Sequence, residues 1–299
     1  MVERAAVLSV EREVTPVNGR LILRPEQIPL NEQDLRRRLS GSLVELPIYA
    51  SMLVTDGIRG GLSYLRYCRD SHRWLNELPR GHKEPVVLET GYMGPEWSLK
   101  PMKDRFLRIG YRSKIARLQA KVNRELIEKR AEIVAETFDD VDSGSDETVY
   151  GVGWSKGTLD VLAAAHLYPE VFSRGAHFAL LGIPLEVNPA LGRIYLGTQA
   201  INKLVSGRTD VALMRKLNLA GGMRIPEGIK ITVVESENNG ISTFRNDGYP
   251  EVHYVRCAHT AFGFDQEVFR IMAWKFAGYE LAQVKTADGL TTYAPYSLK

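Results

Sequence analysis

The pentapeptide Gly-Trp-Ser-Lys-Gly at residues 153–157 constrains the fold of this chain more than any other feature. A short β-type run precedes it at residues 148–152, and residues 158–168 after it have helical spacing and end at Pro169. A serine between a strand and a helix, with glycine two positions before and after it, predicts a sharp turn at which strand and helix approach closely. Such a turn projects the hydroxyl of Ser155 over the sheet edge, beside the first amides of the helix.

Strand-like runs alternate with helical patterns from Pro85 onward. Apolar runs predict strands at residues 86–90, 111–118, 148–152, 176–183, 229–234 and 252–255, and helical periodicity predicts helices at 95–109, 122–138, 158–168 and 265–279. This alternation predicts an α/β fold, a doubly wound and mainly parallel sheet with helices on both faces. Residues 149–152 and 231–234 are mainly apolar runs, which is typical of parallel strands buried on both faces.

Residues 1–84 do not follow this alternation. We expect them to form an N-terminal extension, made of a hairpin and helices, that packs on the core. Asn18-Gly19 between apolar residues predicts the hairpin turn, and Asn31 could cap a short helix. Residues 43–78 have helical apolar spacing, and the glycines at 57, 60 and 61 predict two helices there instead of one.

Residues 85–299 are expected to form one α/β domain with an insertion at about 187–226. The insertion has no strand-like run and contains recurring glycines. It is suited to a lid that caps a substrate pocket, or to two surface helices that only cover the sheet.

Two backbone amides near Ser155 are candidates for an oxyanion hole. One belongs to Tyr92, in the loop 90–94 that follows the first predicted strand, and the other to Lys156, directly after the serine. A plain strand-to-helix turn is the alternative for that loop. The side chain of Lys156 either points to solvent along the helix or adds positive charge near an anionic substrate.

His259 is the candidate general base. Of the six histidines, it alone is expected in a loop at the C-terminal end of a predicted strand, within Cys-Ala-His-Thr-Ala-Phe-Gly at residues 257–263. A general base must reach the serine oxygen, and a loop after the last core strand can deliver one. A structural histidine is the alternative.

With these motifs, residues 85–279 resemble the α/β-hydrolase superfamily, roughly two thirds of the chain. They look most like the bacterial esterase and lipase group that has a G-W-S-x-G elbow and a final histidine turn. The resemblance implies a serine ester hydrolase, carboxylesterase-like or lipase-like, that forms an acyl-enzyme on Ser155 with His259 as general base. Its substrate would be a small-molecule acyl ester or a lipid. An inactive binding or scaffold protein and an acyltransferase are the alternatives.

The position of the triad acid departs from this family. The family places an aspartate in a turn of the form S-x-x-D-G-I, and residues 236–241 here carry Asn239 at that position. An amide can orient an imidazole but cannot stabilise its charged form. Asn239 could act itself, Glu237 or Glu235 of the same turn could replace it, or Glu186 after the preceding strand could supply the carboxylate. A weakened or inactive site is the fourth possibility.

The charge distribution suggests one surface of interest. The chain has a formal net charge of +3, yet residues 100–130 carry 11 basic and three acidic side chains. We expect a solvated basic face there, or a docking surface for an acidic partner or anionic lipid. Seven acidic residues and no basic one follow in residues 132–147, and no nucleic-acid-binding motif is present, so nucleic acid is not expected as a partner.

Other classes of protein are disfavoured. No Cys/His cluster has zinc spacing, and no dinucleotide-binding or Walker motif occurs, so we expect neither a metal nor a cofactor. Two cysteines, Cys68 and Cys257, do not suggest a disulfide framework. Without a visible signal peptide or membrane span, we expect a cytoplasmic protein. The sequence does not indicate an oligomeric state.

Overall fold

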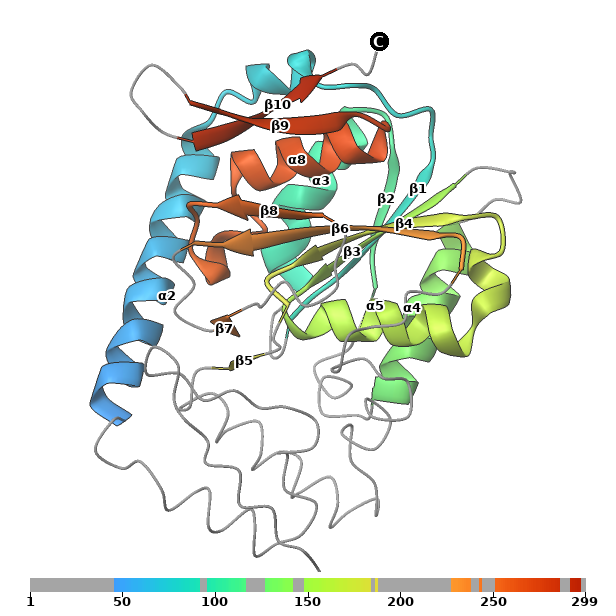
Figure 1. The fold of residues 1–299 in the computed structure, drawn as a ribbon, viewed down its shortest axis with the longest axis horizontal. Coiled ribbons are helices and arrows are strands. Elements are labelled where there is room, and N and C mark those ends of the chain that lie inside the picture. Colours follow the sequence, from blue (N-terminus) through green and yellow to red (C-terminus); the bar gives the residue numbers. More distant parts are fainter. Residues whose placement is uncertain are drawn as a thin grey trace, which may run out of the picture.

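The computed structural model describes residues 46–91, 96–116, 127–141, 148–183, 186–187, 227–237, 242–243, 251–285 and 291–296. Its centre is a six-stranded sheet with the order β2-β1-β3-β4-β6-β8, in which all neighbouring strands are parallel (Figure 1). The strands are β1 (Pro85–Glu89), β2 (Arg112–Ile115), β3 (Val149–Trp154), β4 (Ala176–Leu181), β6 (Ile229–Ser236) and β8 (Val252–Val255). The predicted parallel sheet is confirmed, and β3 lies inside it.

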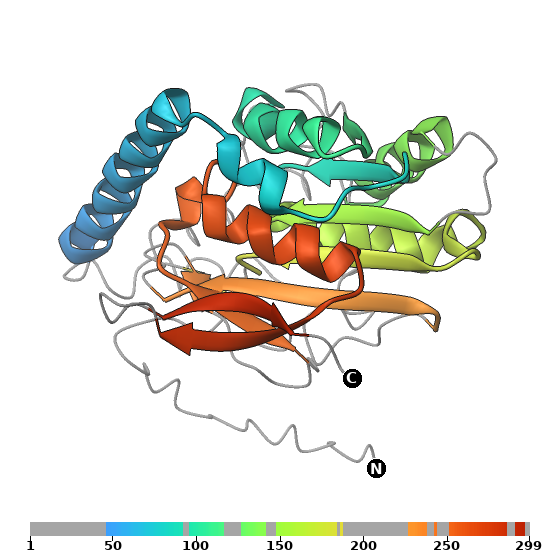
Figure 2. The same cartoon turned by 90° about the horizontal axis from the view of Figure 1, so that it is seen from above.

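Helices cover both faces of the sheet, as predicted (Figure 2). One face packs against α3 (Lys100–Arg108) and α8 (Gln266–Phe276), and the other against α4 (Ile127–Val141) and α5 (Lys156–Leu167). Along β1 the side chains alternate between the two layers, because successive residues of a strand point to opposite faces. Val86 and Leu88 join the first cluster, and Val87 joins the second.

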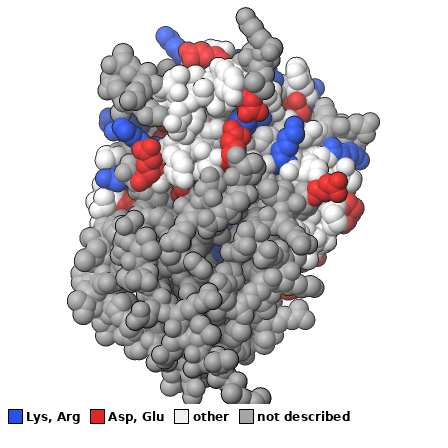
Figure 3. Space-filling model, in the orientation of Figure 1, with Lys and Arg blue, Asp and Glu red and all other residues white. Residues whose placement is uncertain are grey.

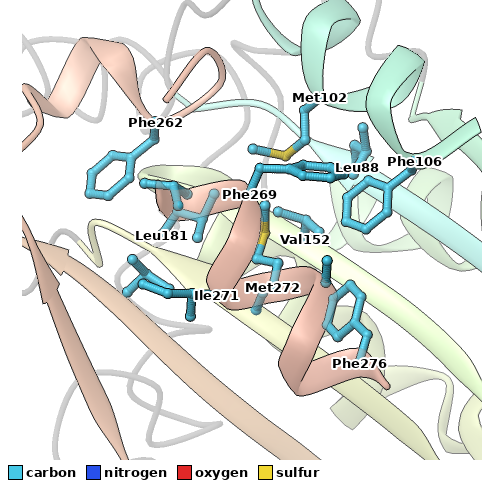
Figure 4. Close-up of a cluster of buried hydrophobic side chains, with 14 of the residues drawn as sticks. Leu88, Met102, Phe106, Val152, Leu181, Phe262, Phe269, Ile271, Met272 and Phe276 are labelled. Atoms are coloured by element: carbon cyan, nitrogen blue, oxygen red, sulfur yellow. The ribbon is translucent and has the colours of Figure 1, made fainter. Parts of the chain in front are cut away.

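The larger hydrophobic cluster lies between the sheet, α3 and α8 (Figure 4). Phe106 of α3 and Phe269 of α8 meet there with ring centroids 4.7 Å apart. Val152 of β3 and Leu181 of β4 line the sheet side of the cluster. The strands that carry the candidate site are therefore fixed from both sides by buried apolar contacts.

Short elements complete the described structure. Four 3-10 helices are η2 (Arg73–Glu77), η3 (Glu96–Leu99), η5 (Pro169–Phe172) and η6 (His259–Ala261). The sequence did not predict two antiparallel strand pairs. They are β9 (Glu280–Lys285) with β10 (Thr291–Tyr296), and β5 (Glu186–Val187) with β7 (Ser242–Thr243). The hydroxyl of Tyr293 on β10 accepts a hydrogen bond from the Tyr254 amide of β8 at 2.7 Å, which ties the C-terminal pair to the sheet.

The expectation of two helices within residues 43–78 is wrong. One helix, α2 (Leu46–Arg69), runs through all three glycines, and η2 follows it. Gly60 lies so close to the side chain of Thr260 that a Cβ atom has no room. Glycine here permits a close tertiary contact, and that contact outweighs its low helix propensity.

Some of the predicted elements fall on residues outside the described ranges. They are the hairpin at Asn18-Gly19, the helix from Asn31 and residues 188–226 of the insertion. The division into an extension and one α/β domain stays a prediction. Among the described helices, none has the length and apolar character needed to cross a membrane.

Candidate active site

Ser155 occupies a strained turn between β3 and α5. Its backbone has φ 53° and ψ −122°, a conformation that costs a residue with a side chain about 1–3 kcal/mol and persists only where its surroundings enforce it. The Ser155 amide donates to the Leu181 carbonyl at 2.7 Å. The carbonyl of Ser155 accepts from the amide of Thr158 at 3.0 Å and from its hydroxyl at 2.7 Å. The turn is thus held from β4 and from α5.

Glycines around Ser155 allow three segments to converge. A Cβ atom on Gly153 would lie 2.6 Å from the Cα of Thr158, and one on Gly157 would lie 2.6 Å from two carbonyl oxygens at the end of β1. A Cβ atom on Gly91 would lie 2.9 Å from the Cβ of Ser155. The loop after β1 therefore begins beside the serine, as an oxyanion loop requires. Tyr92 itself lies outside the described residues.

Lys156 directly follows Ser155 and is the first residue of α5. The oxyanion role of its amide stays a prediction. Its side chain is buried, which corrects the expectation that it points to solvent. The positive charge of its ammonium group opposes the rise that burial causes in the pKa of Glu89.

These buried charges form a cluster beneath the serine turn, made of Glu89, Arg130, Lys156 and Asp160. The Nε atom of Arg130 on α4 donates to a carboxylate oxygen of Asp160 on α5 at 2.9 Å. Burial, and after it the charge of Asp160, raise the pKa of Glu89 well above its usual value, against the opposing effects of Arg130 and Lys156. Glu89 is thus a carboxyl group for which the protonated form is favoured.

His259 lies in η6, on the turn that follows β8, and is buried. Its carbonyl accepts a hydrogen bond from the indole of Trp154 at 3.1 Å, which joins the histidine turn to the residue before Ser155. Burial lowers the pKa of His259 to about 4, and the nearby charge of Asp56 opposes that shift. The imidazole is therefore neutral at pH 7, the form that can accept a proton from an alcohol.

Ser155 and His259 both contact the end of β4. The serine amide bonds the carbonyl of Leu181, and the imidazole packs on Gly182, where a Cβ atom would lie 2.8 Å from the ring atoms Cε1 and Nδ1. Gly182 also has φ +59°, which favours glycine. Leu181 and Gly182, which are adjacent at the end of β4, therefore contact Ser155 and His259 respectively.

Asp56 is the residue of this site that sequence reasoning missed. Its carboxylate accepts hydrogen bonds from the amides of His259 and Thr260, both at 2.9 Å, and its carbonyl accepts one from the Thr260 hydroxyl at 2.7 Å. Asp56 is buried on α2, within the predicted N-terminal extension. A single acid in an apolar helix was the only signal, and nothing in the sequence identified its partner.

The candidate acids after β6 and near β5 fall in different surroundings. Glu235 is buried as the second-last residue of the strand β6, and its side chain accepts a hydrogen bond from the Ser236 amide at 3.1 Å. Glu237 is exposed and pairs with Arg256 at 3.2 Å. Glu186 begins β5, and Asn239 lies outside the described residues.

The basic segment 100–130 is not uniformly solvated. Arg105 and Arg130 are buried, so the expectation of a solvated basic face is wrong for these two residues. Two of its lysines pair with residues of the acidic stretch, the half-buried Lys114 with Asp140 at 2.7 Å and the exposed Lys129 with Glu132 at 2.6 Å. Accordingly, basic and acidic side chains intermingle on the face that Figure 3 shows.

No protein-family model and no curated protein match this sequence. Solved structures do resemble it. The Bacillus licheniformis lipase BlEst2 in its mature form matches with a TM-score of 0.50 at 14% identity, over 66% of this chain and 93% of the lipase. The propeptide form of the same lipase matches with a TM-score of 0.51 at 14% identity, over 71% of this chain and 54% of that one. The chain has the α/β-hydrolase fold.

A metagenomic carboxyl esterase is also similar, with a TM-score of 0.46 at 16% identity, over 60% of this chain and 66% of the esterase.

In the α/β-hydrolase fold, a nucleophile sits on a sharp strand-to-helix turn at the carboxyl ends of the strands, and the histidine follows the acid in the chain. In this chain, Ser155 lies on the turn between β3 and α5, and His259 lies on the turn that follows β8.

Proposed function

We propose that this protein is a serine hydrolase that acts on carboxylic esters through an acyl-enzyme. The observation that carries the proposal is the strained backbone of Ser155 between β3 and α5, at the same strand end as the buried, neutral imidazole of His259. Strain persists where the surrounding structure enforces it, and such residues cluster at active sites. A structural turn between strand and helix does not need a serine with positive φ.

In the proposed reaction, the Ser155 hydroxyl attacks the ester carbonyl while His259 accepts its proton. The imidazolium returns that proton to the leaving alcohol, and water then attacks the acyl-enzyme by the same route in reverse. The amides of Tyr92 and Lys156 would hold the oxyanion. The lipase and esterase names of the structural neighbours support an acyl ester or lipid as substrate.

The third member of the triad is proposed among the candidates that the sequence left open. Asn239 occupies the family position in the sequence, and Glu235 is a buried carboxylate near the end of β6. The surface pairing of Glu237 with Arg256 ranks it below Glu235. Asp56 adds a carboxylate that bonds the backbone of the histidine turn.

Hydrolysis of p-nitrophenyl esters with acyl chains of increasing length tests this function. We expect turnover by the wild-type chain and a loss of at least about a thousandfold in kcat for Ser155→Ala. Ser173→Ala is the matched control, because Ser173 is the exposed residue directly after η5 and its hydroxyl donates to the Glu170 carbonyl. Equal turnover by wild type and Ser155→Ala would contradict the proposal.

The same assay separates the candidates for the third member. If Asn239 orients His259, Asn239→Asp raises kcat and Glu235→Gln leaves it nearly unchanged. If Glu235 supplies the charge, Glu235→Gln lowers kcat by orders of magnitude and Asn239→Asp has little effect.

A further inference from the structure

The helix α2 has two opposite faces of different character. Asp56 and Gly60, one turn apart, face the histidine turn and contact it. The opposite face carries an aliphatic stripe at spacings of four, four and three residues. This outer stripe consists of Val54, Ile58, Leu62 and Leu65, which are 52–62% exposed. Figures 1 and 2 both show α2 at the periphery of the molecule.

The outer stripe is accompanied by positive charge. Arg59, Arg66 and Arg69 are exposed along the same helix, and its one acidic residue, Asp56, is buried. Within the described part of the chain, no ion pair involves any of these three arginines. This contrasts with Lys114 and Lys129, whose charges are paired with acids. The accessible surface of α2 is therefore both apolar and positively charged.

An exposed tryptophan lies next to this helix. Trp97 on η3 is 61% exposed, and its ring lies 6.3 Å from that of Tyr64 on α2 in an edge-on arrangement. Tyr64 is exposed as well. Tryptophan and tyrosine favour the boundary between water and lipid, since each has an apolar body and a polar tip.

We propose that the outer stripe and the arginines of α2 dock the protein on an anionic lipid surface. Aliphatic side chains with an adjacent row of cations are the features that let a helix lie in the headgroup region of a charged bilayer. A second copy of this chain fits the face less well, because a symmetric pairing of two α2 helices would bring the same arginines together. Since Asp56 bonds the histidine turn from the inner face of this helix, docking would also hold the candidate site near the lipid.

Cosedimentation with lipid vesicles tests the docking face without any assay of activity. We expect the wild-type chain to bind phosphatidylcholine vesicles that contain phosphatidylglycerol and not those of phosphatidylcholine alone, and to be released by high salt. Each arginine near a charged surface contributes about a fivefold gain in binding, so Arg59→Gln with Arg66→Gln should weaken it by roughly 25-fold. Ile58→Gln with Leu62→Gln removes apolar insertion without a change in charge, and should weaken binding by at least about tenfold.

Leu107→Gln with Arg108→Gln is the matched control, because both residues are exposed on α3 and the change in composition is similar. We expect this variant to bind like wild type. The proposal would be overturned if the wild-type chain did not bind anionic vesicles, or if it bound neutral vesicles equally well. It would also be overturned if the control variant lost as much binding as the α2 variants. So would a wild-type dimer in light scattering that Ile58→Gln with Leu62→Gln converts to monomer, since the stripe would then be a contact between copies. The ester hydrolysis assay is separate, so failure of either proposal can be told from failure of the other.

Discussion

Asp56 of α2 accepts a hydrogen bond from the backbone amide of His259 at 2.9 Å, across 203 positions of sequence. Its second carboxylate oxygen accepts from the amide of Thr260 at the same distance. A buried carboxylate with two backbone donors fixes a turn firmly, because hydrogen bonds to a charged group are stronger than neutral ones. A helix that precedes the first strand of the sheet thereby helps to position the candidate general base.

Replacing Asp56 with asparagine should weaken both the fold and the proposed activity. The amide presents an N–H group where a second backbone donor needs an acceptor, which costs about 1–3 kcal/mol. The lost negative charge also disfavours the imidazolium that forms during the reaction, so kcat should fall while KM changes little. Denaturant unfolding and ester kinetics measure the two effects. Asp104→Asn is the control, since that surface carboxylate pairs only with exposed Lys100 among the described residues. Unchanged kcat in Asp56→Asn would contradict the positioning role.

Two glycines of α2 should respond in opposite directions to substitution by alanine. A Cβ atom on Gly57 would have no other atom within 4 Å, so Gly57→Ala should stabilise the protein by up to about 1 kcal/mol through helix propensity. Gly60 lies against Thr260, so Gly60→Ala should displace the helix from the histidine turn, destabilise the fold and lower kcat. Thermal unfolding and ester kinetics of the two variants check this. Equal effects would show that α2 does not pack on that turn.

The pH dependence of the reaction should reflect the buried state of His259. With a pKa of about 4 in the folded chain, the imidazole stays neutral well below the usual range, and kcat/KM should hold its value down to about pH 5. Because the unfolded chain binds the same proton near pH 6.5, stability should decrease as the pH falls from about 6.5 towards 4. An acidic limb of kcat/KM near pH 6.5 would contradict a buried general base.

Glu89 should give the opposite pH dependence of stability to that of His259, with stability lost as the pH rises. Burial raises its pKa, so the folded chain holds a proton that the unfolded chain releases above about pH 4.5. The contribution of this bound proton to the stability of the folded chain is therefore lost as the pH rises from 4.5 towards the raised pKa. Glu89→Gln imitates the protonated form and should make the protein more stable than wild type at pH 8, with a smaller gain at pH 5. Chemical denaturation at pH 5 and pH 8 measures this. A variant less stable than wild type at pH 8 would show that the charged form is favoured.

The core elements of the fold could be predicted from the sequence because they are encoded locally. The runs around β3 and β6 are mostly apolar, as is typical of parallel central strands, and Gly153 and Gly157 surround Ser155 at fixed spacing. The turn of Ser155 follows from those neighbours alone. The histidine turn was placed by elimination among six histidines, because a strand and a helix border His259.

Features that depend on distant partners could not be predicted. Arg105 is buried because its guanidinium donates to the carbonyls of Phe264 and Asp265, at 2.8 and 3.0 Å, about 160 positions away. Arg130 is buried because Asp160 compensates its charge. In the sequence, both look like ordinary members of a basic surface. Asp56 is a third case, since its role depends on the approach of α2 to the turn of His259.

Labelling with a fluorophosphonate probe, followed by mapping of the modified peptide, tests the central claim most directly. Such probes react with a serine that an adjacent base activates and that oxyanion donors support. We expect a single adduct on Ser155, absent in Ser155→Ala, strongly reduced in His259→Ala and unchanged in Ser173→Ala. A folded wild-type protein without an adduct on Ser155, or with labelling that persists in Ser155→Ala, would contradict the assignment of Ser155 as the nucleophile.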